Sequence, residues 1–310
     1  MEKFKIKYIL FFLLTLSQTG FSEDKITKTI LINGTKFTYP LIEKWAAEYV
    51  KTRPDIQVKI VRKPTEADQI NIRVIAYNPA QNEFAENKKL FFVGKYALLP
   101  ITSNSNPLLA KFHKKGLDKD DLEKLYFEDD IYTESKAKPV KPIITPVIYA
   151  REGQACSARA FSDYFGHKSS ELKGKKISGD DSYLLTAVKK DSLGISYNIP
   201  ANIYDLNSRK IKVGLAVLPV NLKKESNDVF TSDLDQVLGL FERTKFETVP
   251  VEKIGFVFTE DGNSAEISEF LKWVVTEGQK YNHDLGFLTL EKEIVTAQLK
   301  QLDTKYIASK

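Results

Sequence analysis

The spacing of hydrophobic and polar positions changes period twice between residues 27 and 61. Residues 27–32 are β-branched and apolar, and they stop at the Asn-Gly pair 33–34, which is typical of a turn. From Tyr39 to Tyr49, apolar residues recur at three- and four-residue intervals, which predicts a helix. Residues 56–61 then alternate again and predict a second strand. Strand, helix and strand in this order predict a βαβ unit with a parallel sheet.

The same alternation continues along the rest of the chain. Further strands are predicted at residues 69–76, 91–101, 143–150, 193–199 and 249–259, and further helices at residues 117–125, 155–165, 182–188, 265–276 and 290–302. Asp118 is the expected N-cap of the first of these helices. Residues 136–141 contain a proline and are expected to form a loop. Because the βα alternation stops and then restarts, we predict an α/β chain with two lobes.

The first 22 residues have the pattern of an export signal. Three lysines in residues 1–7 precede the apolar run 8–16, and residues 17–22 are mostly polar. This run is too short to cross a hydrocarbon core of about 30 Å, which takes roughly 20 residues. We expect a signal peptide at 1–22, cleaved near Ser22, and a periplasmic or secreted product. The alternative is an uncleaved N-terminal anchor.

Composition and charge exclude several classes of function. A chain of 310 residues that is 42% hydrophobic and 28% charged is neither disordered nor a coiled coil. Its net charge of +5 is too weak a field for a nucleic-acid partner. The single cysteine, Cys156, and three scattered histidines form no pattern typical of a metal site or a catalytic triad. We therefore expect no cofactor, no metal and no enzymatic activity.

Four stretches of the sequence, in this order, resemble the phosphate-binding protein family of bacterial ABC importers. They are residues 33–45, 106–122, 151–157 and 270–287. The resemblance implies a type II periplasmic-binding-protein fold, an α/β fold with two lobes, a central cleft and two crossing strands. Lobe 1 would comprise residues 23–95 plus 250–310, and lobe 2 residues 96–249. It also implies a monomer that binds a small, phosphate-like anion and works with an ABC permease.

The resemblance places the ligand at the starts of three helices, where free N–H groups carry a partial positive charge. The first expected site comprises Lys36, Phe37 and Thr38, where Lys36 replaces a threonine of the family. The second comprises Arg151, which matches the family's arginine, and Ser157, which replaces a threonine. At the third, Ser182 is the expected contact. The neighbouring Asp180 and Asp181 are expected only to cap the helix.

The sequence departs from the family most strongly after Val61. The family has a glycine- and serine-rich loop there, then a helix, and later an aspartate that accepts a hydrogen bond from protonated phosphate. This chain runs directly into the next strand and shows no such aspartate. Arg73 or Tyr77 is expected to line the opening instead, which would admit a larger or different anion.

Three classes of function stay open at this point. The first is an exported solute-binding protein. The second is an interaction or scaffold protein of the cell envelope that keeps the fold and has lost phosphate binding. The third is a secreted enzyme, which is weakest because no nucleophile, base and orienting group occur together in the sequence.

Overall fold

The computed structural model describes residues 28–80, 83–127, 145–153, 155–223, 229–245, 247–259 and 264–308, with the backbone alone for 264 and 303–308. The expected signal peptide at 1–22 and the expected loop at 136–141 lie outside the described residues. Within them, no helix is both long and apolar enough to span a membrane.

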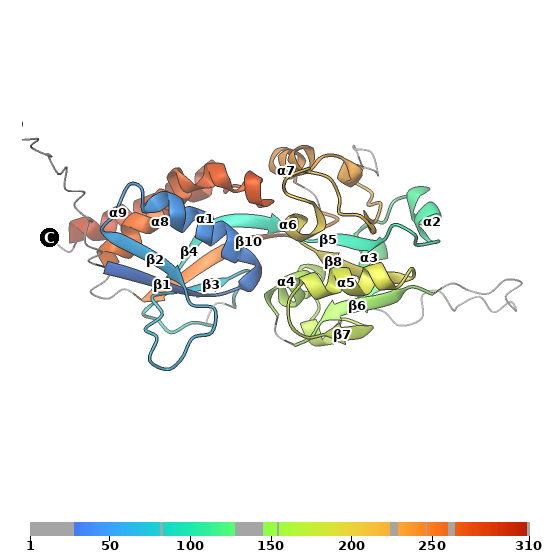
Figure 1. Ribbon diagram of the computed structural model, residues 1–310, viewed down its shortest axis with the longest axis horizontal. Coiled ribbons are helices and arrows are strands. Elements are labelled where there is room, and N and C mark those ends of the chain that lie inside the picture. The colour runs from blue at the N-terminus through green and yellow to red at the C-terminus, as the bar shows by residue number, and fades with distance from the viewer. Residues whose placement is uncertain are drawn as a thin grey trace, which may run out of the picture.

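Ten described strands form two five-stranded sheets (Figure 1). The first sheet has the order β2-β1-β3-β10-β4, and the second has the order β7-β6-β8-β5-β9. The strands are β1 Lys28–Gly34, β2 Ile56–Ile60, β3 Ile72–Ile75, β4 Lys88–Ala97, β5 Leu99–Ser103, β6 Val147–Arg151, β7 Lys175–Ile177, β8 Gly194–Asn198, β9 Leu215–Val217 and β10 Val251–Thr259.

Helices pack against each sheet and complete two α/β lobes, as predicted. Lobe 1 here means the first sheet with its helices, and lobe 2 means the second sheet with its helices. Lobe 1 contains α1 Tyr39–Tyr49, α8 Ser264–Thr276 and α9 Lys292–Ala308, with the short 3-10 turns η1 Lys36–Thr38, η4 Gly278–Tyr281 and η5 His283–Leu285. Lobe 2 contains α2 Leu109–His113, α3 Lys119–Phe127, α4 Cys156–Phe165, α5 Ser182–Lys190, α6 Pro200–Ile203 and α7 Leu234–Arg243, with η2 Ser169–Glu171 and η3 Val229–Thr231.

The first βαβ unit follows the prediction. Strands β1 and β2 are parallel, and α1 begins with Pro40 in its first turn, where its missing N–H is not needed. The buried face of α1 includes Leu41 and Trp45, both fully inaccessible to solvent. The indole Nε1 of Trp45 donates a hydrogen bond of 2.9 Å to the carbonyl of Gly278. This contact fastens α1 to the C-terminal part of the same lobe.

The chain passes between the lobes twice. Strand β4 of the first sheet is followed, after Leu98, by β5 of the second sheet. On the return, Pro250 leads into β10, and the Leu98 amide donates a hydrogen bond of 3.0 Å to its carbonyl. The single strand predicted at 91–101 is therefore wrong in one respect, because it is two strands that belong to different sheets. Apolar residues continue through the break since both strands are buried there.

Other elements match the predictions within a few residues. Helices α1, α4, α5 and α8 start and end close to the predicted positions, and the predicted strand at 69–76 is shorter, at Ile72–Ile75. Helix α7 was not predicted, although Leu234, Val237, Leu238 and Phe241 have helical spacing and are buried. Its N-cap, Asp233, accepts a hydrogen bond from the amide of Asp235.

A polar cluster joins the lobes on the side of the crossing strands. We call Glu242 of α7, His283 of η5 and Thr289 the hinge-side clasp. The Nε2 of His283 lies 2.9 Å from a carboxylate oxygen of Glu242, and the Thr289 amide donates to the same oxygen at 2.8 Å. Arg209 of lobe 2 also donates to the His283 carbonyl at 2.9 Å, while its guanidinium pairs with Asp235.

The clasp predicts that stability depends on pH near neutrality. The hydrogen bond to Glu242 raises the pKa of His283 above 6.5, with nearby Asp235 adding to the effect and Arg209 opposing it. Burial opposes ionisation of Glu242, but the hydrogen bonds from His283 and Thr289 lower its pKa to about 2. Protonated His283 therefore contributes its full share to the free energy of unfolding below about pH 6.5, and this share is lost as the pH rises through the raised pKa.

We expect the melting temperature to fall more between pH 6 and pH 8 for the unmodified chain than for His283→Gln. The difference should be about 2–4 °C, because a partly exposed ion pair contributes at most about 1 kcal/mol. Differential scanning calorimetry at both pH values measures it. If the melting temperature falls equally for both proteins, the protonation of His283 does not contribute to the stability of the clasp.

Candidate functional site

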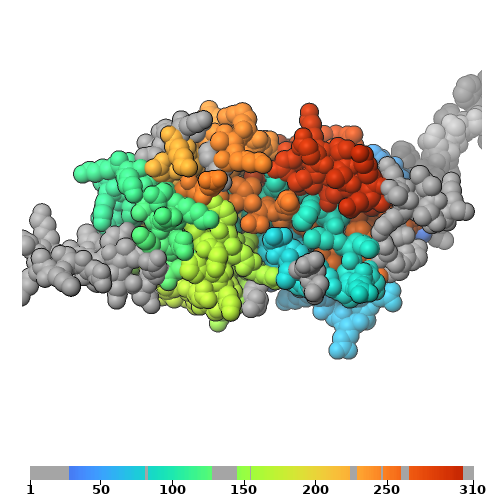
Figure 2. All heavy atoms as spheres, turned by 180° about the vertical axis from the view of Figure 1, so that it is seen from behind, coloured from blue at the N-terminus to red at the C-terminus, as the bar shows by residue number. Residues whose placement is uncertain are grey.

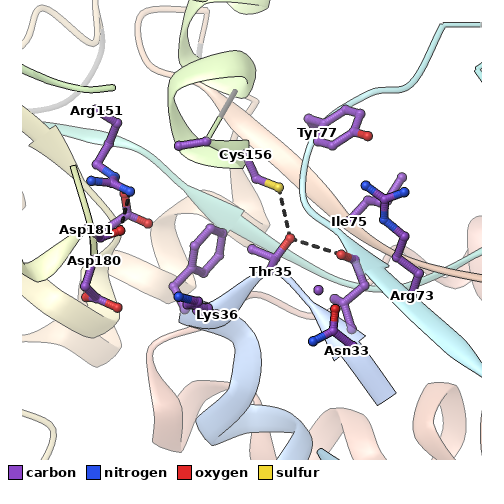
Figure 3. Close-up of a pocket in the computed structure, with 15 residues that line it drawn as sticks. Asn33, Thr35, Lys36, Arg73, Ile75, Tyr77, Arg151, Cys156, Asp180 and Asp181 are labelled. Carbon is purple, nitrogen blue, oxygen red and sulfur yellow. Dashed lines mark hydrogen bonds and ion pairs between the residues drawn. The ribbon is translucent and has the colours of Figure 1, made fainter. Parts of the chain in front are cut away.

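A pocket of about 450 Å³ lies between the two lobes. Its walls come from the turn after β1, from β3, from the start of α4 and from the turn before α5 (Figure 3). These four segments are far apart in sequence, and the two sheets bring them together. The pocket is therefore built by the whole fold rather than by one motif.

The lobe 1 wall contains the first helix start, residues 34–37. The Thr35 amide donates a hydrogen bond of 3.1 Å to the Val74 carbonyl, which holds the turn against β3. No side chain caps η1, and its first turn contains no acidic residue. Among the described residues, the amides of Lys36 and Phe37 have no hydrogen-bond acceptor. These two N–H groups are thus free to bind an acceptor in the pocket.

The lobe 2 wall contains the start of α4, with Ala155 and Cys156. This helix too has no side-chain cap and no acidic residue in its first turn. The hydroxyl Oγ1 of Thr35 lies 3.1 Å from the Sγ of Cys156, so the two helix starts from opposite lobes touch (Figure 3). Their partial positive charges therefore meet at one edge of the pocket.

Arg151 lines the pocket at the end of β6, and only 8% of the residue is exposed. Its Nε lies 3.0 Å from a carboxylate oxygen of Asp181. Its Nη1 donates to the Ile177 carbonyl at 2.6 Å, and its Nη2 donates to the Gly179 carbonyl. The guanidinium keeps one further N–H on each of these two nitrogens. The arginine is accordingly in the pocket, but its charge is already paired.

Asp181 is a site residue whose role the sequence did not reveal. Its side chain is 16% exposed, it lines the pocket, and the hydroxyl of Ser157 donates to its Oδ1 at 2.6 Å. Burial raises the pKa of this carboxyl, and the contacts with Ser157 and Arg151 oppose the shift. The expectation that Asp181 only caps α5 is wrong, since its side chain makes no capping hydrogen bond. Asp180 does cap, because it accepts the amide of Ser182 at 2.9 Å.

The six residues expected to bind the ligand fall into two groups. Lys36, Phe37 and Arg151 line the pocket. Thr38, Ser157 and Ser182 do not, and they act behind it or beside it. Thr38 is fully buried and donates to the Thr35 carbonyl at 2.7 Å, whereas Ser157 holds Asp181.

Strand β3 and its extension supply a second row of side chains. Arg73, Ile75 and Tyr77 alternate along the backbone and all face the pocket (Figure 3). Arg73 and Lys36 are exposed, and neither forms an ion pair with a described residue. The expectation that Arg73 or Tyr77 lines the opening is confirmed for both.

An ion pair joins the lobes beside this row. We call Tyr77, Glu83 and Arg159 the cleft latch. Arg159 of α4 donates to both carboxylate oxygens of Glu83, at 3.0 and 2.6 Å, and its guanidinium lies 3.9 Å from the centre of the Tyr77 ring. The Tyr77 hydroxyl donates to Glu83 as well. The hydrogen bonds from Arg159 lower the pKa of Glu83 to about 2, so the latch is charged at neutral pH.

Figure 2 shows, from behind, the regions of the two lobes that adjoin where these contacts lie. The orange α7 region meets the red C-terminal region, and the yellow-green α4 region meets the cyan region around β3 and β4. The hinge-side clasp and the cleft latch thus connect the lobes at two separate places.

Arg159→Met should separate the lobes without unfolding either one. The substitution keeps the side-chain stem but removes a bidentate pair of charge-assisted hydrogen bonds. We expect a larger radius of gyration in small-angle X-ray scattering and a loss of about 1 kcal/mol in stability. Arg53→Met is the matched control, because Arg53 forms a bidentate pair with Asp55 inside lobe 1. A scattering curve unchanged by Arg159→Met would mean that the latch does not hold the lobes together.

Across the described parts of the chain, no three His, Cys, Asp or Glu side chains come together as a set of metal ligands. The pocket's polar groups include N–H donors, three cationic side chains and two carboxylates, of which Asp181 is paired with Arg151 and Asp180 accepts the Ser182 amide, and this set suits an anion better than a cation.

Comparisons with known proteins identify the fold. No protein-family model matches this sequence, and no curated protein matches it either. Solved structures do. A putative phosphate ABC transporter substrate-binding protein with bound phosphate, from Clostridium perfringens, matches with a TM-score of 0.61 and 16% identity, over 85% of this chain and 100% of that one. An ABC-type phosphate transport receptor from Vibrio cholerae matches with a TM-score of 0.57 and 12% identity, over 84% and 100%.

The fold is that of the periplasmic binding proteins. A possible phosphate binding protein from Planctomyces limnophilus also matches, with a TM-score of 0.52 and 14% identity over 90% of this chain and 99% of that one. The predicted two-lobed α/β architecture is therefore confirmed. Identities this low show similarity of fold alone.

Proposed function

We propose that this chain is an exported solute-binding protein that binds phosphate or a related oxyanion between its lobes and presents it to an ABC permease. The observation that carries this proposal is the contact between two uncapped helix starts from opposite lobes, at Thr35 and Cys156. An anion in the adjoining pocket would accept hydrogen bonds from backbone N–H groups of both lobes at once. Binding would then stabilise the closed arrangement, as a hinged binding protein requires.

Charge supports an anionic ligand. The pocket contains three cationic side chains, Lys36, Arg73 and Arg151, and two carboxylates, Asp180 and Asp181. Arg151 and Asp181 neutralise each other, and Asp180 faces the amides at the start of α5. Lys36 stands beside the free amides of η1 and keeps its charge for the ligand. The three solved structures reported above are those of phosphate-binding or phosphate-transport proteins by description, which agrees with this chemistry.

Isothermal titration calorimetry with phosphate tests the proposal. Lys36→Gln should weaken phosphate binding about tenfold, since it removes a charge-assisted contact worth roughly 1.4 kcal/mol. Lys59→Gln is the control, because Lys59 is an exposed residue of β2 outside the pocket. It should leave the affinity unchanged. No heat with phosphate, sulfate or phosphonates for the unmodified chain would overturn the proposal.

A second function has one specific observation in its favour. In lobe 2, Arg151 is held by Asp181 and two carbonyls, and Asp180 already occupies the start of α5. A cleft in which these donors are satisfied internally fits an envelope interaction protein that no longer transports an anion. Co-purification with a partner other than a permease, together with no thermal shift from anions, would favour this second function.

A further inference from the structure

The pocket is larger than one oxyanion needs. Its volume of about 450 Å³ falls within the range of roughly 300–1,000 Å³ that is typical of sites for small organic ligands. A water molecule takes about 30 Å³ in the liquid, so an anion of five heavy atoms fills only a fraction of this space. The ligand could therefore extend beyond the helix starts.

The pocket also has two separate cationic ends. Asn33 and Arg73 are directly paired in the parallel register of β1 and β3, whereas Lys36 lies beyond the end of β1. In Figure 3, Lys36 and Arg73 lie on opposite sides of Thr35, and the Thr35–Cys156 contact stands between them. One small anion is thus poorly placed to neutralise both side chains.

The wall near Arg73 has the character of an organic subsite. Ile75 is 1% exposed and Tyr77 is 7% exposed, so packing holds both side chains in place on the Arg73 side of the pocket. The cleft latch holds the Tyr77 ring, because Glu83 accepts its hydroxyl and Arg159 covers its face. Arg73 has no ion-pair partner among the described residues, and a guanidinium binds a planar carboxylate through two parallel hydrogen bonds.

We infer that the ligand is a short organic molecule with two anionic groups, a phosphate or phosphonate at Lys36 and the helix starts and a carboxylate at Arg73. The inference rests on the proposed function, since it uses the same pocket for the first group. It adds a specificity-determining residue, Arg73, and a ligand class, the phosphorylated or phosphonylated carboxylic acids. The organic spacer would pass beside the Thr35–Cys156 contact and reach Ile75 and Tyr77 at the Arg73 end of the pocket.

Two commercially available probes of equal length test the inference by calorimetry. 3-Phosphoglycerate carries a phosphate and a carboxylate, whereas glycerol 3-phosphate has a hydroxymethyl group in place of the carboxylate. We expect 3-phosphoglycerate to bind at least tenfold more tightly. Arg73→Gln should reduce this ratio to below about threefold and leave the affinity for glycerol 3-phosphate unchanged. Arg62→Gln, at an exposed arginine outside the pocket, should keep the full ratio.

The possible failures are distinguishable. Equal affinities of the unmodified chain for the two probes, with phosphate still binding, would overturn the inference and leave the proposed function intact. Equal weakening of both probes and of phosphate by Arg73→Gln would place Arg73 at the oxyanion itself, which also overturns it. Absence of binding for phosphate and both probes would remove the proposed function together with the inference. Melting temperatures of the variants show whether they are folded, and within the part of the chain that the structure describes Arg73 has no partner whose loss would prevent folding.

Discussion

Gly34→Ala is expected to destabilise the protein by about 3 kcal/mol or more, because it combines backbone strain with a clash. Gly34 has a φ of 137°, a conformation that residues with a side chain rarely adopt. A Cβ there would lie 2.2 Å from the Val74 carbonyl oxygen and 2.6 Å from the Val74 nitrogen. These are backbone atoms of the central part of the sheet, so they cannot move aside without breaking the pairing of β1 and β3.

Gly153→Ala is the matched control for this prediction. Gly153 also has a positive φ, of 66°, but a Cβ there would meet nothing within 4 Å. Gly153→Ala should therefore lower the stability by only about 1 kcal/mol, the penalty for a left-handed backbone. Urea unfolding of the two variants separates the clash from the strain. Equal losses for both would contradict the close approach of the turn after β1 to β3, on which the lobe 1 wall of the pocket depends.

Asp181→Asn should change both stability and anion preference. The substitution leaves the buried Arg151 without its ionic partner, which we expect to cost about 3 kcal/mol. Phosphate at neutral pH carries a proton that a carboxylate accepts, whereas sulfate is fully ionised and is repelled. The ratio of sulfate affinity to phosphate affinity should therefore rise at least tenfold in calorimetry at pH 7.

Asp180→Asn is the control, because asparagine is as good a cap as aspartate and the exposed carboxylate of Asp180 has no arginine partner. It should change stability by less than about 1 kcal/mol and shift the anion ratio less than threefold. If Asp181→Asn leaves the ratio where it was, Asp181 serves only to hold Arg151.

The sequence reveals those parts of the molecule that depend on local periodicity. The burial of Ile42 beside Leu41, Trp45 and Tyr49 is the pattern that predicts α1, because a helix places all four side chains on one face. A strand would turn Ile42 to the opposite face from the other three. The break at Leu98 is not predictable in this way. Both β4 and β5 are buried, and a continuous apolar run does not show where a chain leaves one sheet for another.

The site, too, has features that local sequence patterns predict and features that depend on the packing of distant segments. The helix starts at Lys36 and Cys156 follow from local patterns and from the resemblance to a known family. The role of Asp181 does not, because its partner Arg151 is thirty residues away and meets it only through the packing of lobe 2. The cleft latch is similar, since Glu83 and Arg159 come from different lobes. A local pattern at Asp180 and Asp181 indicates a cap for either residue and cannot tell which carboxylate pairs with Arg151.

Crystals grown with arsenate, a tetrahedral stand-in for phosphate, test the central claim most directly. Anomalous scattering locates the arsenic atom independently of any starting coordinates. We expect one strong peak between the lobes, with arsenate oxygens about 3 Å from the amide nitrogens of Lys36 or Phe37 and of Cys156 or Ser157. Ordered crystals with no anomalous peak in this pocket, or with peaks only on the outer surface, would contradict an anion site shared by the two lobes.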